Sequence, residues 1–158
     1  AYFEKERREL VSLNYSESSR CVLSGGTIET LGCATYFAEL IDEWAAEADP
    51  DERLFRLGTA TLEALVSGVP VEPLARYFEC WLLKLQGVYP TDLSLSGDAE
   101  AFVTGVRHVA PLEVETLGAT ARTLRELEHA HRILIRALLD REPRSIRVIH
   151  ELRRTPAL

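Results

Sequence analysis

Apolar residues recur every three or four positions over three consecutive stretches of the chain, and this spacing places them on one side of an α-helix. The first stretch runs from Thr30 toward Asp49, the second follows Asp51, and the third begins at Leu74 and stops at Gly87. The apolar positions of the three stretches are, in order, Leu31, Ala34, Phe37, Leu40 and Trp44; Leu54, Leu57, Leu62 and Leu65; and Tyr77, Phe78, Trp81, Leu82 and Leu85. We therefore expect three amphipathic helices.

Residues that end or begin helices separate these stretches. Pro50 disfavours the helical conformation in the residue before it, and Asp51 suits the N-cap of the next helix. Gly68 suits the left-handed conformation at a helix end, and Gly87 is a stop signal for the third helix. Pro73 is tolerated in a first turn because its missing N–H has no partner there. Because the links are short, the three helices are predicted to be antiparallel neighbours in a bundle.

The helical spacing is lost over residues 91–111, which contain Gly97, Gly105 and Pro111. Turn-forming residues between short apolar runs are typical of loops and hairpins. We expect a loop or a small hairpin insertion in this segment, with the hairpin near residues 99–110 and its bend at Gly105.

Helical spacing returns after this insertion. Apolar residues from Leu117 to Leu138, with His131 in the same stripe, predict a long helix that ends near Arg141. Pro143 breaks that helix. A short final helix is indicated by Ile146, Ile149 and Leu152.

The N-terminal residues follow a different pattern. Residues 1–13 alternate aromatic and charged side chains and fit a short extended segment, whereas residues 14–26 are polar and rich in turn-forming types. The chain opens on Ala1 in the middle of such a pattern, so we expect a piece of a longer protein. The predicted fold class is mostly α, a bundle of about five helices with a short N-terminal extended segment.

Length and composition narrow the class of protein. A chain of 158 residues can bury one full core but not two, and 46% hydrophobic and 27% charged residues are ordinary for a globular domain. No window approaches the roughly 18 uninterrupted apolar residues of a spanning helix, so no membrane association is expected. No secretory leader is visible, and we expect a cytoplasmic protein.

The net charge of −7 is distributed unevenly along the chain. Residues 1–121 carry nine Lys and Arg against twenty Asp and Glu, whereas residues 122–158 carry nine Arg against five acids. Phosphate attraction depends on locally clustered cations, so this basic end could meet nucleic acid or an acidic partner. The alternative is a solvated helix face balanced by acids of its neighbours. The cluster comprises Arg132, Arg136, Arg141, Arg144 and Arg147, and Arg makes bidentate phosphate contacts that Lys cannot.

No arrangement of side chains typical of catalysis or metal binding is found. No Gly-rich loop matches a nucleotide-binding fingerprint, and no Ser or Cys occupies a nucleophile elbow. His129 and His131 are two apart on a helix and point in different directions, and we interpret His131 as a partly buried packing residue. The spacing of Cys21, Cys33 and Cys80 matches neither a zinc site nor a disulfide framework. We expect neither an enzyme nor a bound cofactor.

The aromatic helix around residues 77–81 has two interpretations. Aromatic rings beside cations can form a stacking platform for single-stranded bases. However, Arg76 is the one Arg close by, and Glu79 lies within the aromatic run. We therefore favour a role in the core of the bundle.

Several short motifs occur in a fixed order along these helices. They are A-x-Y-x-x-E-L at Ala34, Tyr36, Glu39 and Leu40, a Leu-Phe pair at 54–55, F-E-x-x-L-L at 78–83, and G-x-x-P at 87–90. These motifs resemble the helical C-terminal part of the bacterial RecO family of recombination mediators. The closing REPRSIRVIHEL, which includes Ser145, resembles the basic final segment of that family, and the opening EKERRELVSL resembles the last strand and exit of its OB-fold.

The resemblance implies an organisation and a function. Residues 1–13 would be the remnant of an N-terminal OB-fold strand with its linker, and residues 14–158 the helical domain. Proteins of the RecO family anneal complementary strands and, with RecR, help to load RecA onto strands coated by single-strand-binding protein. The expected partners are therefore single-stranded DNA, RecR and the acidic tail of single-strand-binding protein.

The same resemblance bears on individual residues. Many relatives carry a four-Cys zinc site after G-x-x-P, but residues 91–121 contain no Cys, so we expect no zinc. The candidate phosphate contacts are Lys5, Arg7, Arg8, Arg132, Arg136, Arg141, Arg144 and Arg147.

Two other functions stay open on this evidence. A helical protein-interaction module without nucleic-acid contact would use the Arg-rich end to dock an acidic partner. A small-molecule-sensing domain would need a sizeable apolar pocket between helices.

Overall fold

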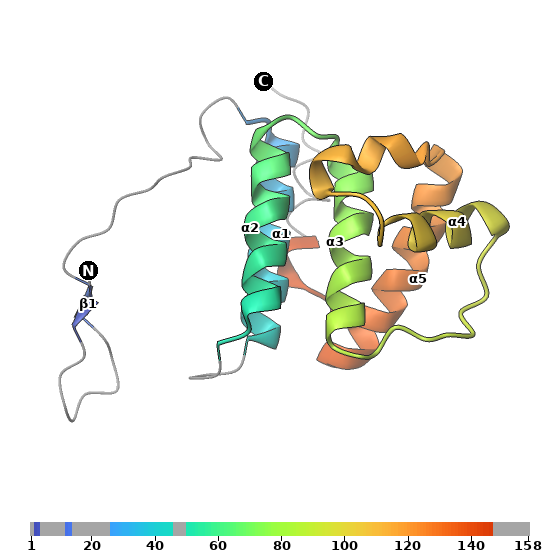
Figure 1. Ribbon diagram of the computed structural model, residues 1–158. Coiled ribbons are helices and arrows are strands. Elements are labelled where there is room, and N and C mark those ends of the chain that lie inside the picture. Colours follow the sequence, from blue (N-terminus) through green and yellow to red (C-terminus); the bar gives the residue numbers. More distant parts are fainter. Residues whose placement is uncertain (1, 4–11, 14–25, 46–49, 147–158) are drawn as a thin grey trace, which may run out of the picture.

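The computed structural model describes residues 2–3, 12–13, 26–45 and 50–146, and these are mostly helical (Figure 1). The helices are α1 (Ile28–Trp44), α2 (Glu52–Val66), α3 (Val71–Leu85), α4 (Gly97–Gly105), the 3-10 helix η1 (Pro111–Leu117) and α5 (Ala121–Leu139). Two short strands, β1 (Tyr2–Phe3) and β2 (Ser12–Leu13), pair antiparallel, with Tyr2 opposite Leu13. The predicted fold class, a mostly α helical bundle, is confirmed.

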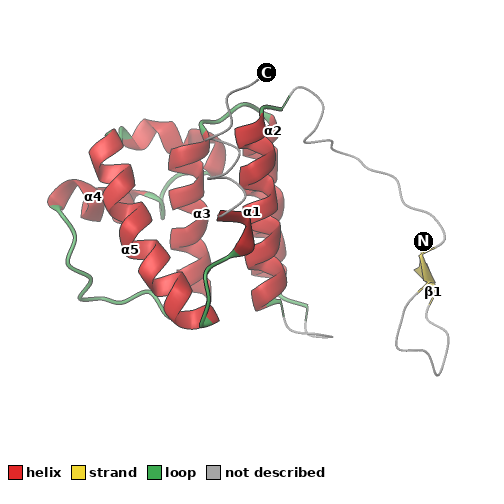
Figure 2. Ribbon diagram, turned by 180° about the vertical axis from the view of Figure 1, so that it is seen from behind, coloured by secondary structure: helices red, strands yellow, loops and turns green. Residues whose placement is uncertain are grey.

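Helix α3 lies at the centre of the bundle. It packs against α1, α2, α5 and η1, and Figures 1 and 2 show α1 and α5 on opposite sides of it. Its side chains Leu74, Phe78, Leu82 and Leu83 are 0% exposed, and the Phe78 ring stacks on that of Phe37 with centroids 4.2 Å apart. Each such side chain supplies about 1.5–3 kcal/mol of transfer free energy. The aromatic helix therefore serves the core.

The helix ends follow the expected local chemistry. Asp51 accepts hydrogen bonds from the N–H groups of Arg53 and Leu54 at the start of α2. Gly68 and Gly87 adopt the left-handed region, with φ of 88° and 69°. The cap at Asp51, the left-handed Gly68 and the helix end at Gly87 are confirmed, and Gly68 lies in the short link that makes α2 and α3 neighbours.

The expected hairpin near residues 99–110 is wrong. Residues 97–105 form helix α4, whose N-cap Ser96 accepts a hydrogen bond from the N–H of Ala99. Residues Ala99, Phe102 and Val106 are spaced for one helix face, and all three are buried. Gly105 lies in the last turn of this helix rather than at a bend.

Polar side chains of α3 hold the end of α4 in place. Lys84 Nζ donates to the Val103 carbonyl at 2.9 Å, and Trp81 Nε1 donates to the Val106 carbonyl at 3.1 Å. The Tyr77 hydroxyl donates to the Val109 carbonyl at 3.1 Å. Because the last carbonyls of a helix lack partners within it, these bonds satisfy groups that burial would otherwise leave unpaired.

The long C-terminal helix begins later in the sequence than expected. Leu117 belongs to η1, and α5 begins at Ala121 after the N-cap Thr120. At its other end Asp140 takes a left-handed conformation, with φ of 52°. The predicted final helix lies largely beyond residue 146 and so outside the described residues.

Candidate nucleic-acid and partner interfaces

The predicted phosphate contacts fall into two groups. Lys5, Arg7, Arg8 and Arg147 lie outside the described residues. Arg132 and Arg136 lie on α5, and Arg141 and Arg144 follow its end. The structure thus brings the second group to one end of the bundle.

Carboxylates neutralise two of these four arginines. The Arg141 guanidinium forms ion pairs with Glu39 and Glu43 of α1, and Arg132 pairs with Glu142. Arg141 therefore connects the end of α5 to α1. Arg136 and Arg144 are exposed, and no ion pair to either occurs within the described part of the chain.

A longer row of basic side chains follows the exposed face of α5. It consists of Arg122, Arg125, His129, Arg132 and Arg136, all of them exposed, and we call it the α5 row. The spacing alternates three and four residues, so at 3.6 residues per turn the row stays within a sector of about 80°. At 1.5 Å per residue it is about 21 Å long. The α5 row is a straight track of basic side chains.

The two acids that flank this row, Glu126 and Glu128, have partners outside it. Glu126 accepts hydrogen bonds at 2.6 Å from both the N–H and the hydroxyl of Ser96. Glu128 lies 3.6 Å from the Arg76 guanidinium. Among the described residues, Arg122, Arg125 and Arg136 form no ion pair. Arg122, Arg125 and His129 were not among the predicted contacts, although their alternating spacing is present in the sequence.

A cluster of buried polar groups links α1, α3 and α5, and we call it the Glu79 cluster. Glu79 of α3 is 3% exposed and accepts hydrogen bonds from the Tyr36 hydroxyl at 2.8 Å and Arg76 Nη2 at 2.8 Å. His131 is 0% exposed, and its Nδ1 lies 3.0 Å from Glu79. Because an ionised carboxylate only accepts, Nδ1 carries the proton. The other ring nitrogen of His131 is 3.1 Å from the Tyr89 hydroxyl.

The Glu79 cluster perturbs the ionisation of its members. Burial opposes the charge of Glu79, but the Arg76 charge and the hydrogen bonds from His131 and Tyr36 outweigh it, and the pKa of Glu79 is lowered. Burial, followed by the Glu79 charge, raises the pKa of Tyr36 well above its ordinary value. No group of three or more metal-ligating side chains occurs within the described part of the chain. The expectation for His131 is corrected: it is fully buried and hydrogen-bonded to Glu79, rather than a partly buried packing residue.

A second carboxylate, Glu39 of α1, fixes the chain beyond α5. It accepts from the N–H groups of Arg144 and Ser145, both at 2.8 Å, and from the Ser145 hydroxyl at 2.5 Å. Although partial burial opposes its charge, these bonds lower the pKa of Glu39. The motif residues Tyr36 and Glu39 thus have defined partners, one on α3 and the other at the C-terminal end.

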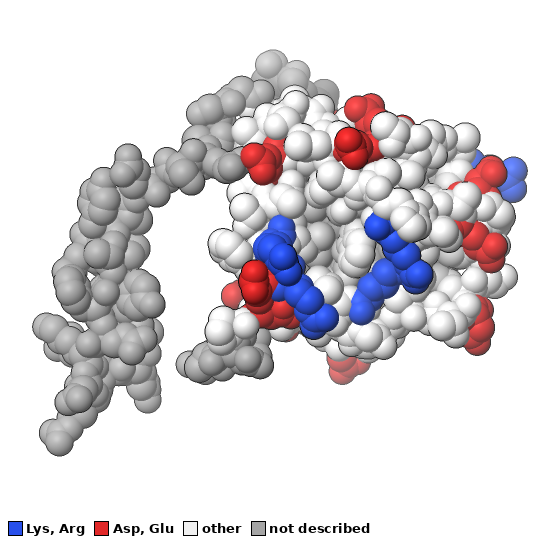
Figure 3. Space-filling model, in the orientation of Figure 1, with Lys and Arg blue, Asp and Glu red and all other residues white. Residues whose placement is uncertain are grey.

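The opposite face of the bundle carries a groove between α2, α3 and η1. Its floor comprises Leu57, Ala60, Tyr77, Trp81, Leu85 and Pro111, and one wall carries Arg53 and Arg56. On the other side of Trp81, a neighbouring hollow is lined by Lys84 and Arg107. Figure 3 shows two groups of basic side chains on this face, one of them over α2, with uncharged surface between. We call this surface the front groove.

Comparison with known proteins connects these motifs to a family. The family model described as "Recombination protein O C terminal" matches residues 25–93, a segment that holds Tyr36, Glu39 and Glu79. Residues 25–93 therefore resemble the C-terminal domain of the RecO family. The chain is 32% identical over 90 residues to the DNA repair protein RecO of Koribacter versatilis, and 37% identical over 60 residues to that of Geobacter metallireducens.

These matches cover only part of each RecO protein. The first spans 56% of this chain and 36% of the relative, and the second spans 38% of this chain and 25% of the relative. No solved structure is significantly similar to the chain. Among the described residues, no helix has the length and apolar character needed to cross a membrane.

Proposed function

We propose that the chain acts in DNA repair and recombination as a non-enzymatic RecO-type mediator that binds single-stranded DNA through the α5 row. In this role it assists strand annealing and, with RecR, the loading of RecA in the cytoplasm, without zinc or another cofactor. The match of residues 25–93 to the RecO C-terminal family model, and the similarity to DNA repair proteins RecO, support the class of function. The α5 row is the observation that supports the contact with DNA.

Local charge favours binding of a strand here. Four arginines form a line on an otherwise acidic molecule of net charge −7, and within the described part of the chain Arg132 alone among them forms an ion pair, with Glu142. Guanidinium groups bind phosphates in a bidentate manner, and each contact releases counterions from the strand. Because the row is straight and about 21 Å long, it can contact several successive phosphates of an extended strand. Of the arginines expected from the sequence, Arg132 and Arg136 belong to this row, whereas Arg141 serves mainly to hold α5 to α1.

The test compares two variants of equal charge. One reverses Arg122, Arg125 and Arg136 to Glu, and the control reverses Arg53, Arg56 and Arg107 to Glu on the opposite face. All six side chains are exposed, so both variants are expected to fold. Fluorescence anisotropy with a labelled single strand should show a large loss of affinity for the first variant and a small one for the control. Equal losses would show that net charge alone governs binding.

The front groove supports a second, compatible role in binding an acidic protein tail. Its apolar floor beside Trp81 and Leu85 can bury a terminal apolar side chain, while Arg53, Arg56 and Lys84 attract acidic residues before it. We assign this surface to the acidic tail of single-strand-binding protein. A synthetic peptide of that tail should lose affinity for the Arg53, Arg56 and Arg107 variant and keep it for the α5 variant. The reverse result would place the tail on α5.

This pair of variants also separates the competing functions. A module that only binds proteins would keep its affinity for the peptide and bind no single-stranded DNA at low salt. That outcome would remove DNA contact from the function of this part of the chain.

A further inference from the structure

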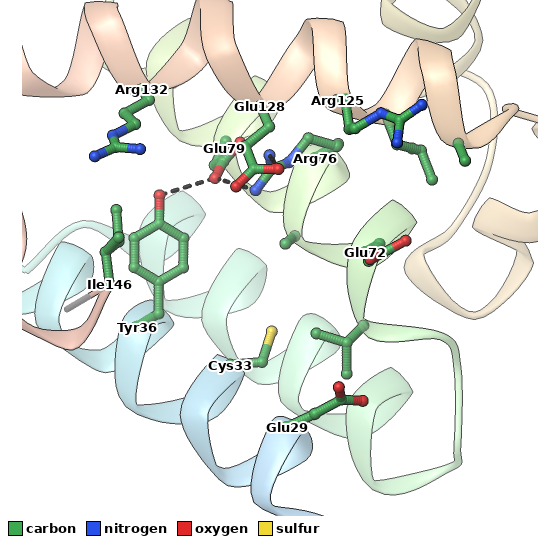
Figure 4. A pocket seen from close by; sticks show the side chains of 14 residues that line it. Glu29, Cys33, Tyr36, Glu72, Arg76, Glu79, Arg125, Glu128, Arg132 and Ile146 are labelled. Atoms are coloured by element: carbon green, nitrogen blue, oxygen red, sulfur yellow. Dashed lines mark hydrogen bonds and ion pairs between the residues drawn. The ribbon is translucent and has the colours of Figure 1, made fainter. Parts of the chain in front are cut away.

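The α5 row lies beside a cavity of about 160 Å³ between α1, α3 and α5. Figure 4 shows Tyr36, Arg76, Glu79, Arg125, Glu128 and Arg132 around it. Arg125 and Arg132 belong to both features, because they line the cavity and also stand in the row. A ligand in the cavity would therefore lie directly beside a strand on the row.

The walls of the cavity suit a flat apolar ring. Tyr36, Val71, Ala75, Leu124 and Ile146 provide its apolar surface. A cavity of roughly 150 Å³ lined by apolar side chains accommodates one benzene ring. By this comparison the space fits a single six-membered ring better than the two fused rings of a purine.

The polar groups of the cavity suit the edge of such a ring. Arg76 is 9% exposed, and its Nε has no hydrogen-bond partner among the described residues, although Nη2 is bonded to Glu79. A buried N–H without a partner is unusual, and a small rotation of the Arg76 side chain would bring it to a ligand acceptor in the cavity. Glu128, half exposed and 3.6 Å from the Arg76 guanidinium, offers an acceptor close by. The cavity thus presents a donor and an acceptor next to each other.

We propose that this cavity binds one unstacked pyrimidine base of a single strand whose phosphates lie on the α5 row. The base carbonyl accepts from Arg76, its apolar faces contact Tyr36 and Leu124, and the flanking phosphates meet Arg125 and Arg132. This inference rests on the proposed binding of single-stranded DNA and adds a site for one base. A cavity filled only by water is the competing account, because its polar groups can also bind solvent.

The test uses strands that have the same phosphates and differ only in their bases. Three labelled strands of equal length are compared: fully abasic, abasic with a single central thymine, and abasic with a single central adenine. The thymine strand should bind about five- to a hundredfold more tightly than the fully abasic strand, which is the usual range for one stacked base. The adenine should restore little of this gain. Equal restoration by adenine would contradict the assignment to a pyrimidine.

Two substitutions test the cavity itself. Ala121 lies at the exposed start of α5 and lines the cavity, so Ala121→Leu narrows the entrance without disturbing the core. Ala75→Leu fills the interior of the cavity. Each should abolish the advantage of the thymine strand while affinity for the abasic strand is unchanged. Circular dichroism and thermal unfolding establish that the Ala121→Leu variant is folded. A thymine advantage that survives in folded Ala121→Leu would overturn the site.

The results also separate this inference from the proposed function. If the wild-type chain binds abasic and thymine strands equally, the base site is wrong and the phosphate row stands. If it binds neither strand at low salt, the proposed DNA contact fails as well. Thymidine monophosphate serves as a free-nucleotide probe, and we expect it to raise the melting temperature less than the strand with one thymine at equal concentration. A larger shift with the free nucleotide would overturn the assignment to a strand base.

Discussion

Removing the Glu79 carboxylate should destabilise the protein more than any surface substitution. In Glu79→Ala, the buried charge of Arg76 loses its 2.8 Å partner, and the Tyr36 hydroxyl and His131 Nδ1 lose their acceptor. Removing one partner of a buried ion pair costs about 3–5 kcal/mol. The other two donors, Tyr36 and His131, do not add their full desolvation costs, because the site relaxes as a unit. We therefore expect a loss of about 4 kcal/mol in the free energy of unfolding.

This loss is large against the total stability of a domain of this size, which is about 5–15 kcal/mol. Urea unfolding monitored by tryptophan fluorescence measures it directly. The matched control is the double variant Arg76→Met with Glu79→Leu, which replaces the pair by apolar side chains. It should cost less than Glu79→Ala, because no charge is left buried alone. A cost below about 1 kcal/mol for Glu79→Ala would refute the view that the Glu79 cluster joins α1, α3 and α5.

The same group predicts a dependence of stability on pH. The pKa of Glu79 is lowered in the folded state by Arg76, His131 and Tyr36 in spite of its burial. Its contribution is therefore fully present above the unfolded-state pKa of about 4.3 and is lost as pH falls through the lowered folded value. The pKa of Glu39 is also lowered, so its contribution to stability is lost over the same direction of pH change. The difference in unfolding free energy between the wild type and Glu79→Gln isolates the contribution of Glu79, because both proteins contain Glu39. This difference in free energy should shrink as pH falls below about 4. A constant difference would contradict the assignment.

Three further substitutions test local features. Glu39→Ala removes the acceptor of Arg144, Ser145 and Arg141, and it should lower the free energy of unfolding in urea by about 2–3 kcal/mol. It should also speed limited proteolysis of the chain after α5. Unchanged cleavage would show that this carboxylate does not fix the chain there. Gly68→Ala places a side chain at φ of 88° and should cost about 1–2 kcal/mol, whereas a neutral result would mean that the link adopts another conformation. Asp51→Ala removes the N-cap of α2 and should lower the melting temperature by a few degrees, with Asp51→Asn as the control that keeps an acceptor; equal effects of the two would argue against capping.

The fold was predictable where local chemistry decides it. The apolar stripes of α1, α2 and α3, the cap at Asp51 and the left-handed Gly68 and Gly87 all act within a few residues of each other, so the sequence pattern contains them. Helix α4 was not predicted, because glycines, which favour turns, begin and end its nine residues. The three- and four-residue spacing of Ala99, Phe102 and Val106 contained the correct answer.

The candidate sites were less predictable because their contacts join distant parts of the chain. Glu79 lies 43 residues from Tyr36 and 52 from His131, so nothing near it in the sequence indicated that it would be buried and triply hydrogen-bonded. Arg141 meets its partner Glu43 across 98 residues, and its cationic character alone made it look available to phosphate. The cavity beside Arg76 depends on three helices and has no signature in any one of them.

The most direct test of the account is the salt dependence of single-strand binding. Each phosphate contact with a single strand contributes about 0.7 to the slope of log affinity against log salt. Replacing Arg122, Arg125 and Arg136 together by Gln should therefore lower the magnitude of the slope by about 2, while replacing Arg53, Arg56 and Arg107 by Gln should leave it unchanged. A slope unaltered by the first set would mean that the α5 row does not contact the strand.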